Sequence, residues 1–150
     1  MSVYFMGTIE DLPQESMAEV EQYLRLGVPN FEAMGGAPEC HCVTLGTVQE
    51  GGVHLTVINL LQNPTLAECF MQTNRQSQKV QNIRSCGKAE IAITNGMGFL
   101  VLSCAAEVVE DDRAKADRWE AWMAEYHPQG ASAPDYVLLR FVPESIRVMC

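Results

Sequence analysis

Apolar and polar positions alternate through the central part of the chain, and alternation with a period of two is typical of half-buried β-strands. This pattern predicts six strands, over residues 42–48, 53–61, 66–73, 88–94, 99–109 and 136–142. In the second of these strands, Val53, Leu55 and Val57 share one face. Residues 145–149 are expected to extend the last strand past Pro143.

Two short turns are expected to join these strands into hairpins. Residues 49–52 (Gln-Glu-Gly-Gly) and 95–98 (Asn-Gly-Met-Gly) have the composition of tight hairpin turns. Hairpins outnumber helices, so the predicted class is mainly β with flanking helices (α+β). We expect an antiparallel barrel that is closed or nearly closed, because closure removes exposed strand edges.

The first helix is predicted after Asp11. Its apolar positions recur at helical spacing, at Met17, Val20 and Leu24. Asp11 is expected to cap this helix, with Gln14 reaching back as in a capping box, and Gly27 is expected to end it. The proline- and glycine-rich residues 29–38 are interpreted as a loop.

Two further helices are predicted, over residues 77–86 and from 111 to about 126. The first has Val80 and Ile83 as its buried pair. The second begins at Asp111 and Asp112, which suit the positive end of a helix dipole. Its aromatic and apolar positions lie at helical spacing, at Trp119, Trp122, Met123 and Tyr126. We interpret both tryptophans as residues that pack this helix onto the barrel.

The composition is that of one soluble globular domain. The chain has 150 residues, of which 47% are hydrophobic and 19% are charged. A single domain over 1–150 is therefore expected, with the N-terminal helix and loop in 1–38 and the barrel in 39–150. The formal net charge of -9 argues against nucleic acid or an anionic membrane as the main partner.

Cellular location and redox state follow from what the sequence lacks. No apolar run approaches the ~20 residues needed to span a bilayer. The first residues have no basic segment and no cleavage site, so a cytoplasmic protein is expected. The six cysteines are interpreted as reduced thiols, with Cys69 and Cys104 inside apolar runs.

The candidate chemistry lies where the third strand ends and the second helix begins. Thr73, Ser77 and Lys79 follow one another there as Thr-x3-Ser-x-Lys. Two hydroxyls, one ammonium and the free N–H groups of a helix start suit a phosphate group. The residue types alone favour equally a helix cap at Thr73 or Ser77 with a solvated Lys79.

The order of these elements resembles the pyridoxamine 5'-phosphate oxidase-like family. The segment Thr-x3-Ser-x-Lys is similar to the flavin-phosphate segment of that family, and residues 101–119 are similar to its strand, acidic turn and helix. Residues 126–130 (Tyr-His-Pro-Gln-Gly) and 135–140 resemble the turn and closing strand of its general-stress-protein branch. The resemblance covers roughly residues 40–148.

The resemblance implies an FMN-binding split barrel that forms a homodimer, with FMN in a groove at the dimer interface. Carried over by position, Thr73, Ser77 and Lys79 would hold the phosphate. The cofactor-binding residues that it implies are Thr56, Val57, Ile58, Gln72, Thr73, Ser77, Gln78 and Lys79. Thr56, Val57 and Ile58 would lie under the isoalloxazine ring and supply backbone contacts.

The chain departs from the family pattern at two positions. Thr56 and Gln78 stand where the family often has arginine. Arg75 or Arg84 is the expected substitute partner for the phosphate. Each lost charge-assisted contact is worth about 1.5–3 kcal/mol, so tight binding of FMN does not follow from the resemblance.

Other chemistry-bearing residues are given structural interpretations. Cys40, His41 and Cys42 lack further ligands at metal-binding spacing, so no metal site is expected. The sequence has no nucleophile elbow (Gly-x-Ser-x-Gly) with which His54 or His127 could form a catalytic triad. His127 is interpreted as a pH-sensitive surface group in preference to a group near the flavin, and the acidic residues 107–112 as a solvated helix start.

The leading functional hypothesis is an FMN-dependent oxidoreductase or reductase acting on an unidentified small molecule. Classical pyridoxamine phosphate oxidation is not expected, because the chain shows no Arg- and His-bearing C-terminal segment for that substrate. Two alternatives remain open: a flavin-binding stress protein with little or no turnover, and a split barrel that binds haem or a deazaflavin. No residue stands out as a catalytic acid or base.

Overall fold

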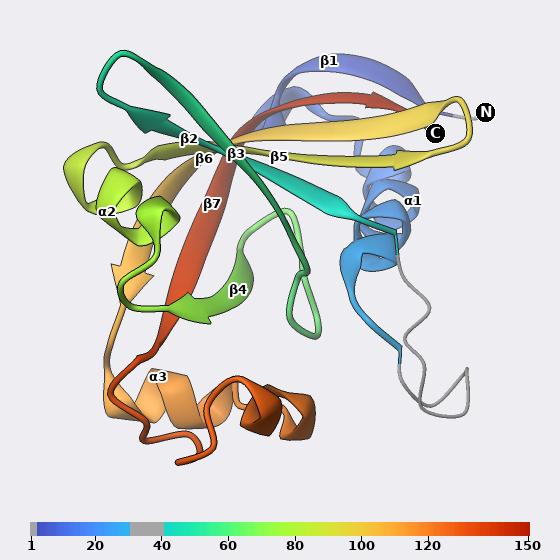
Figure 1. Cartoon of the computed structure of the whole chain (residues 1–150). Coiled ribbons are helices and arrows are strands. Elements are labelled where there is room, and N and C mark those ends of the chain that lie inside the picture. The colour runs from blue at the N-terminus through green and yellow to red at the C-terminus, as the bar shows by residue number, and fades with distance from the viewer. Residues whose placement is uncertain (1–2, 31–40) are drawn as a thin grey trace.

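The computed structural model describes residues 3–30 and 41–150 (Figure 1). The strands are β1 (Tyr4–Thr8), β2 (Val43–Gln49), β3 (Gly52–Ile58), β4 (Cys69–Asn74), β5 (Lys88–Asn95), β6 (Gly98–Val109) and β7 (Tyr136–Met149). The helices are α1 (Gln14–Leu24), α2 (Gln78–Ser85) and α3 (Asp112–Asp117), with 3-10 turns η1 (Ile9–Asp11), η2 (Arg25–Gly27) and η3 (Ala121–Glu125). Most of the expected 29–38 loop lies outside the described residues.

The strands form one antiparallel sheet in the order β1-β7-β6-β5-β2-β3. The long strand β7 organises it. One edge of β7 pairs with β6, and the other pairs with β4 over its first half and with β1 over its second half. The α+β class and the antiparallel split barrel are confirmed. The barrel is not closed, because β1 and β3 end the path without pairing with each other in the described residues.

Strand β7 passes through Pro143 without ending, as predicted. Proline cannot donate a ladder hydrogen bond and is tolerated inside a sheet mainly at irregular positions. Here Pro143 lies opposite Cys104, and the register with β6 shifts between Ser103 and Cys104. At this bulge the other edge of β7 changes its partner, from β4 up to Phe141 to β1 from Ser145 onward.

Strand β1 was not expected from the sequence. The five residues of β1 are not followed by a hairpin turn, and they pair with residues 145–149 at the far end of the chain. The backbone of Val3 also exchanges two hydrogen bonds with the backbone of Cys150, at 3.0 and 2.9 Å. The two ends of the described chain therefore lie side by side, as Figure 1 shows.

Two apolar clusters lie on opposite sides of β7. Val137, Leu139 and Phe141 face the main core inside the curled sheet, whereas Tyr136 and Leu138 face a smaller cluster. The smaller cluster lies between the sheet and the segment that carries α3 and η3. Strand β7 is therefore buried on both faces, which explains its continuous apolar run.

The start of α1 corrects one expectation. Asp11 does not cap α1; it lies in η1, where its N–H donates to the Thr8 hydroxyl at 3.3 Å. Pro13 occupies the cap position of α1 and makes no side-chain cap bond. The capping box with Gln14 is therefore wrong, because η1 turns Asp11 away from the helix.

The predicted single helix over 111–126 is also wrong, because it breaks into α3 and η3. Glu120 is extended (φ -123°, ψ 144°) at the break. Its carboxylate accepts hydrogen bonds from the Gln62 N–H at 3.0 Å and the Trp122 indole N–H at 2.8 Å. The bond to Gln62 is a tertiary contact and the bond to Trp122 is local, and together they hold the extended Glu120 at the break between α3 and η3. No helix within residues 3–30 and 41–150 is long and apolar enough to cross a membrane.

Candidate functional site

A pocket of about 390 Å³ lies where β3, β4, α2 and the segment after η3 meet. Its lining consists of Val57, Ile58, Asn59, Gln72, Thr73, Asn74, Ser77, Lys79, Trp122, Tyr126 and His127. Of the eight residues that the sequence marked, the structure brings six to this one pocket: Val57, Ile58, Gln72, Thr73, Ser77 and Lys79. Strand β3 pairs with β2 and β4 pairs with β7, and the short connection over residues 59–68 joins the two strands, so that residues of both line the same pocket.

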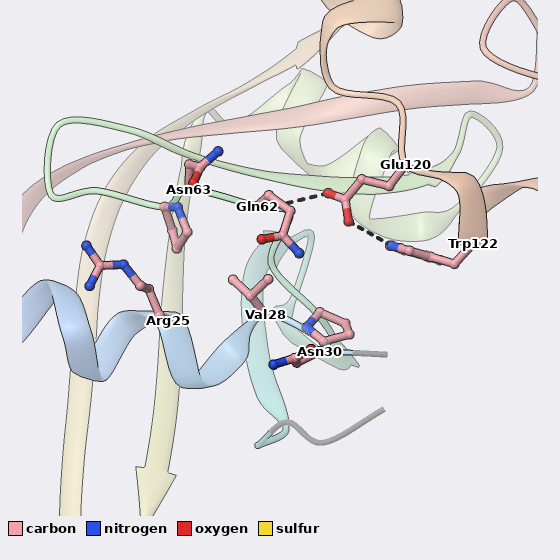
Figure 2. Close-up of a pocket in the computed structure, with 9 residues that line it drawn as sticks. Arg25, Val28, Asn30, Gln62, Asn63, Glu120 and Trp122 are labelled. Carbon is pink, nitrogen blue, oxygen red and sulfur yellow. Dashed lines mark hydrogen bonds between the residues drawn. The ribbon is translucent and has the colours of Figure 1, made fainter. Parts of the chain in front are cut away.

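A larger pocket of about 560 Å³ adjoins the first at Trp122 (Figure 2). Arg25, Asn30, Gln62 and Glu120 are among its lining residues. Figure 2 shows Glu120 between Gln62 and Trp122, in hydrogen-bond contact with both. Trp122 is therefore held in place at the boundary between the two pockets. The smaller pocket is the candidate site, because it alone combines hydroxyls, an ammonium and two large aromatic rings.

The hydroxyls of the candidate site meet where β4 gives way to α2. The Thr73 and Ser77 hydroxyl oxygens lie 3.3 Å apart. Ser77 occupies the cap position of α2, yet its side chain accepts no hydrogen bond from the helix. The Ser77 hydroxyl is therefore directed at Thr73 and the pocket, and the capping interpretation of this side chain is wrong.

Lys79 lies in the first turn of α2 and is half-buried. Burial lowers the pKa of its ammonium, because desolvation disfavours the charged form. No carboxylate of the described residues lies within 4 Å of it, whereas Arg75, Arg84 and Lys88 each have such a partner. A bound anion would offset this desolvation, so this end of the pocket suits a negatively charged group.

Two of the residues marked from the sequence do not line the pocket. The Gln78 amide donates to Asn82 at 2.8 Å, and Asn82 donates to the Thr47 hydroxyl at 3.0 Å. This chain of bonds directs Gln78 along α2 toward β2. Thr56 lies opposite Leu45 in the β2–β3 ladder and is absent from the pocket lining.

The expected arginine substitutes are also directed elsewhere. Arg75 and Arg84 both pair with Glu110, at 2.9 and 3.1 Å. They line a separate hollow with that carboxylate rather than the pocket that contains Lys79. The expectation that either arginine replaces the missing family arginines is therefore wrong.

The pocket lining also includes aromatic and apolar side chains. The Trp122 and Tyr126 rings meet edge to face, with centroids 6.0 Å apart. Val57 and Ile58 approach from β3. Sequence reasoning assigned Trp122 to helix packing and Tyr126 to the buried face of the helix, but the break at Glu120 turns them toward the pocket. A planar ring would find suitable contacts here.

His127 is the largest departure from the sequence interpretation. It is 1% exposed, so the assignment as a surface group is wrong. Its Nδ1 lies 3.2 Å from Asp135 Oδ1, and its Nε2 lies 2.7 Å from Gln72 Nε2. An isolated histidine beside a proline carries no sequence signal for this position, because its partners come from β4 and from the loop before β7.

Among the described residues, the remaining histidines and cysteines that the sequence analysis considered do not line this site. Cys40 is not among the described residues, so the Cys40-His41-Cys42 prediction stays untested. Within 3–30 and 41–150, no group of three or more His, Cys, Asp or Glu side chains is arranged to hold a metal ion. His54 lies opposite Thr47 on β3 and does not line the pocket. Cys69 and Cys104 are buried, as expected.

Solved structures show the same fold at low sequence identity. A Clostridium acetobutylicum protein related to general stress protein 26 has a TM-score of 0.72 and 20% identity, covering 92% of this chain and 90% of its own. General stress protein 26 from Bacillus anthracis has a TM-score of 0.63 and 19% identity, covering 73% and 84%. A FAD-binding protein from Mesorhizobium loti has a TM-score of 0.59 and 12% identity, covering 97% and 99%.

A family model matches most of the chain. No curated protein matches the chain. The family model described as pyridoxamine 5'-phosphate oxidase matches residues 32–150, which include all strands but β1 and every residue that lines the candidate site. The chain therefore belongs to the pyridoxamine 5'-phosphate oxidase family.

Proposed function

We propose that this protein binds FMN in the pocket between β3, β4, α2 and the segment after η3, and uses it as a flavin-dependent oxidoreductase on a small molecule. The observation that carries the proposal is the combination of side chains that line this pocket. The lining combines two hydroxyls and a desolvated ammonium with two aromatic rings and two aliphatic side chains. FMN has the matching parts, a phosphate and a planar ring.

The phosphate would be held by Thr73, Ser77 and Lys79. The two hydroxyls lie close enough to share one anion, and Lys79 lacks a carboxylate partner among the described residues. Since Gln78 is directed along α2, this chain offers one cation where the family pattern often has more. We therefore expect weaker phosphate binding than a site with added arginines would give.

The ring would lie against Val57, Ile58, Trp122 and Tyr126. The pocket volume of about 390 Å³ falls within the range of about 300–1,000 Å³ of small-molecule sites. The likeness to the FAD-binding protein of Mesorhizobium loti supports a flavin, and the family match supports the same cofactor class. A flavin, when bound, supplies hydride and electron transfer, while the protein supplies orientation and electrostatics.

An absorption spectrum tests the proposal first. The purified protein is mixed with excess FMN, desalted and scanned, and we expect retained flavin bands. A colourless protein with no FMN binding in a titration would overturn the proposal. Lys79→Ala is expected to weaken FMN affinity by roughly ten- to a hundredfold, as for loss of a charge-assisted contact. Lys88→Ala is the matched control, because Lys88 lies outside this pocket and pairs with Glu144.

Turnover separates the oxidoreductase from a flavin-binding stress protein. Anaerobic addition of NADH or NADPH to the FMN complex is expected to bleach the flavin, and a small electron acceptor is expected to restore the colour. A complex that holds FMN firmly but is never reduced by either donor would support the flavin-binding stress protein and refute the oxidoreductase. Absorption bands of haem or of a deazaflavin in the purified protein would identify that group, and not FMN, as the ligand.

We also propose a homodimer that forms across the outer face of β3. Val53, Leu55 and Val57 are 68%, 67% and 67% exposed on this strand, which ends the sheet. Three neighbouring apolar side chains on an end strand expose both hydrophobic surface and unpaired backbone. Val57 also lines the candidate site, so a second copy on this face would lie beside the proposed flavin.

The dimer is tested by sedimentation at micromolar concentration. Leu55→Asp is expected to give a folded monomer, because it buries a charge in the proposed interface. Met97→Asp serves as the control, since Met97 is 82% exposed in the β5–β6 turn, away from β3. A wild-type protein that sediments as a monomer with FMN bound would contradict the dimer and leave the cofactor proposal in place.

A further inference from the structure

The imidazole of His127 connects a carboxylate to the lining of the candidate site. Asp135 Oδ1 lies 3.2 Å from Nδ1, and Gln72 Nε2 lies 2.7 Å from Nε2. Gln72 is half-buried and lines the pocket, whereas His127 itself is 1% exposed. His127 also contributes to the pocket lining, but with both ring nitrogens within hydrogen-bond distance of Asp135 and Gln72, its polar influence on a ligand passes through Gln72.

The backbone around this group is held on both sides. The His127 N–H donates to the Met123 carbonyl at 2.9 Å, and its own carbonyl accepts from the Gly130 N–H at 2.9 Å. The Asp135 carbonyl accepts from the Arg75 N–H at 2.7 Å, just past the end of β4. These bonds lie within the protein, so the row formed by the carboxylate, the imidazole and the Gln72 amide does not depend on a bound ligand.

The donors and acceptors in this row have one consistent arrangement. A carboxylate only accepts hydrogen bonds, so Nδ1 of a neutral His127 carries the proton and donates to Asp135. Nε2 is then an acceptor, and the Gln72 NH₂ group donates to it. The Gln72 carbonyl oxygen consequently points away from His127, and Gln72 is one of the residues that line the pocket.

We propose that His127, oriented by Asp135, is a positioning residue that presents the Gln72 carbonyl oxygen to the pocket as a hydrogen-bond acceptor for a ligand donor group. For its ligand this inference rests on the proposed function. FMN offers two kinds of donor to this oxygen, the hydroxyls of its ribityl chain and the N–H of its oxidised ring. A buried site built to accept a hydrogen bond discriminates strongly against ligands that lack the donor.

The tautomer is tested in the ligand-free protein. Nitrogen NMR of ¹⁵N-histidine-labelled protein at neutral pH is expected to show His127 protonated at Nδ1. Asp135→Asn is expected to shift the proton to Nε2, because the asparagine NH₂ group then donates to Nδ1. Wild-type His127 protonated at Nε2 would overturn the inference whether or not FMN binds, so its failure is distinct from failure of the proposed function.

The role in binding is tested by FMN titration of variants. His127→Phe keeps the ring but removes the acceptor, and is expected to weaken FMN affinity about tenfold. His127→Gln restores an acceptor oxygen and is expected to recover most of the affinity, which a merely structural role would not predict. In a Gln72→Ala background, His127→Phe is expected to add no further loss. Full additivity of the two substitutions would contradict action through Gln72.

An FMN analogue methylated at the ring N–H separates the two donor sources. If the ring N–H is the donor, the tenfold effect of His127→Phe disappears with the analogue; if a ribityl hydroxyl is the donor, the effect persists. Either result supports the acceptor role of Gln72. Equal FMN affinity of wild type and His127→Phe, with thermal stability unchanged, would overturn it.

Discussion

The hydroxyl of Tyr136 donates a hydrogen bond of 2.9 Å to the backbone carbonyl of Lys115. This bond joins the start of β7 to α3, and the segment between these two elements supplies Trp122, Tyr126 and His127 to the candidate site. A second bond supports it, because the buried Lys115 ammonium donates to the Ala133 carbonyl at 3.1 Å. The segment over the pocket is therefore held by polar bonds inside an apolar cluster.

Replacing Tyr136 tests this arrangement. Tyr136→Phe keeps the ring but leaves the Lys115 carbonyl without its donor, and Tyr136 is 0% exposed. Loss of one partner of a buried hydrogen bond destabilises a protein by about 1–3 kcal/mol. Urea denaturation measures this change. Tyr4→Phe, at a side chain 78% exposed on β1, is expected to be neutral; equal stability of both variants would refute the prediction.

Gly27 is required for close packing against the sheet. A Cβ added at this position would lie 2.5 Å from Val43 Cγ2 and 3.2 Å from Ile93 Cδ1. Gly27→Ala is therefore expected to destabilise the fold by about 1–3 kcal/mol, the usual range for overpacking a core. Gly52→Ala is the matched control, because a Cβ there meets nothing within 4 Å. Thermal unfolding compares the two, and a fully stable Gly27→Ala protein would contradict the packing described.

Lys79 is expected to stabilise a ligand complex while destabilising the ligand-free protein. Its pKa is lowered by burial in the folded state, so the unfolded chain binds more protons between the folded and unfolded pKa values. Lys79 therefore makes stability rise with pH through that window, below the ordinary lysine value. At neutral pH, Lys79→Met is expected to be more stable than wild type without ligand.

The pH dependence of that difference is the measurement. Urea midpoints of wild type and Lys79→Met are compared from neutral to alkaline pH, and the advantage of the variant is expected to shrink as Lys79 deprotonates in the folded wild type. Lys88→Met controls for loss of a surface lysine, because Lys88 is exposed and paired with Glu144. A constant difference across this range would argue against a desolvated ammonium.

The buried thiols are expected to resist modification. Burial raises the pKa of Cys69 to about 12, and burial also raises the pKa of Cys104. Because the thiolate is the reactive form, both are expected to stay unlabelled by a maleimide at pH 8 in the native protein. Cys42 is exposed and is expected to label rapidly. Mass spectrometry with and without denaturant checks this, and rapid native labelling of Cys69 or Cys104 would contradict it.

The sequence by itself determined the local elements and part of the site. Period-two alternation and glycine-rich turns were sufficient for β2, β3, β5 and β6, since hairpins depend on residues close in the chain. Thr73, Ser77 and Lys79 were predictable as a group because a single strand-to-helix junction carries them. Short-range physics governs such features, so the chain order contains the necessary information.

The tertiary structure decided the features that depend on distant partners. Strand β1 forms because β7 offers it an edge, and the predicted helix over 111–126 breaks because Glu120 bonds to Gln62. Arg75 and Arg84 turn to Glu110, and His127 becomes buried between Gln72 and Asp135. These contacts join residues far apart in the sequence, and their energies exceed the local preferences that periodicity and composition report.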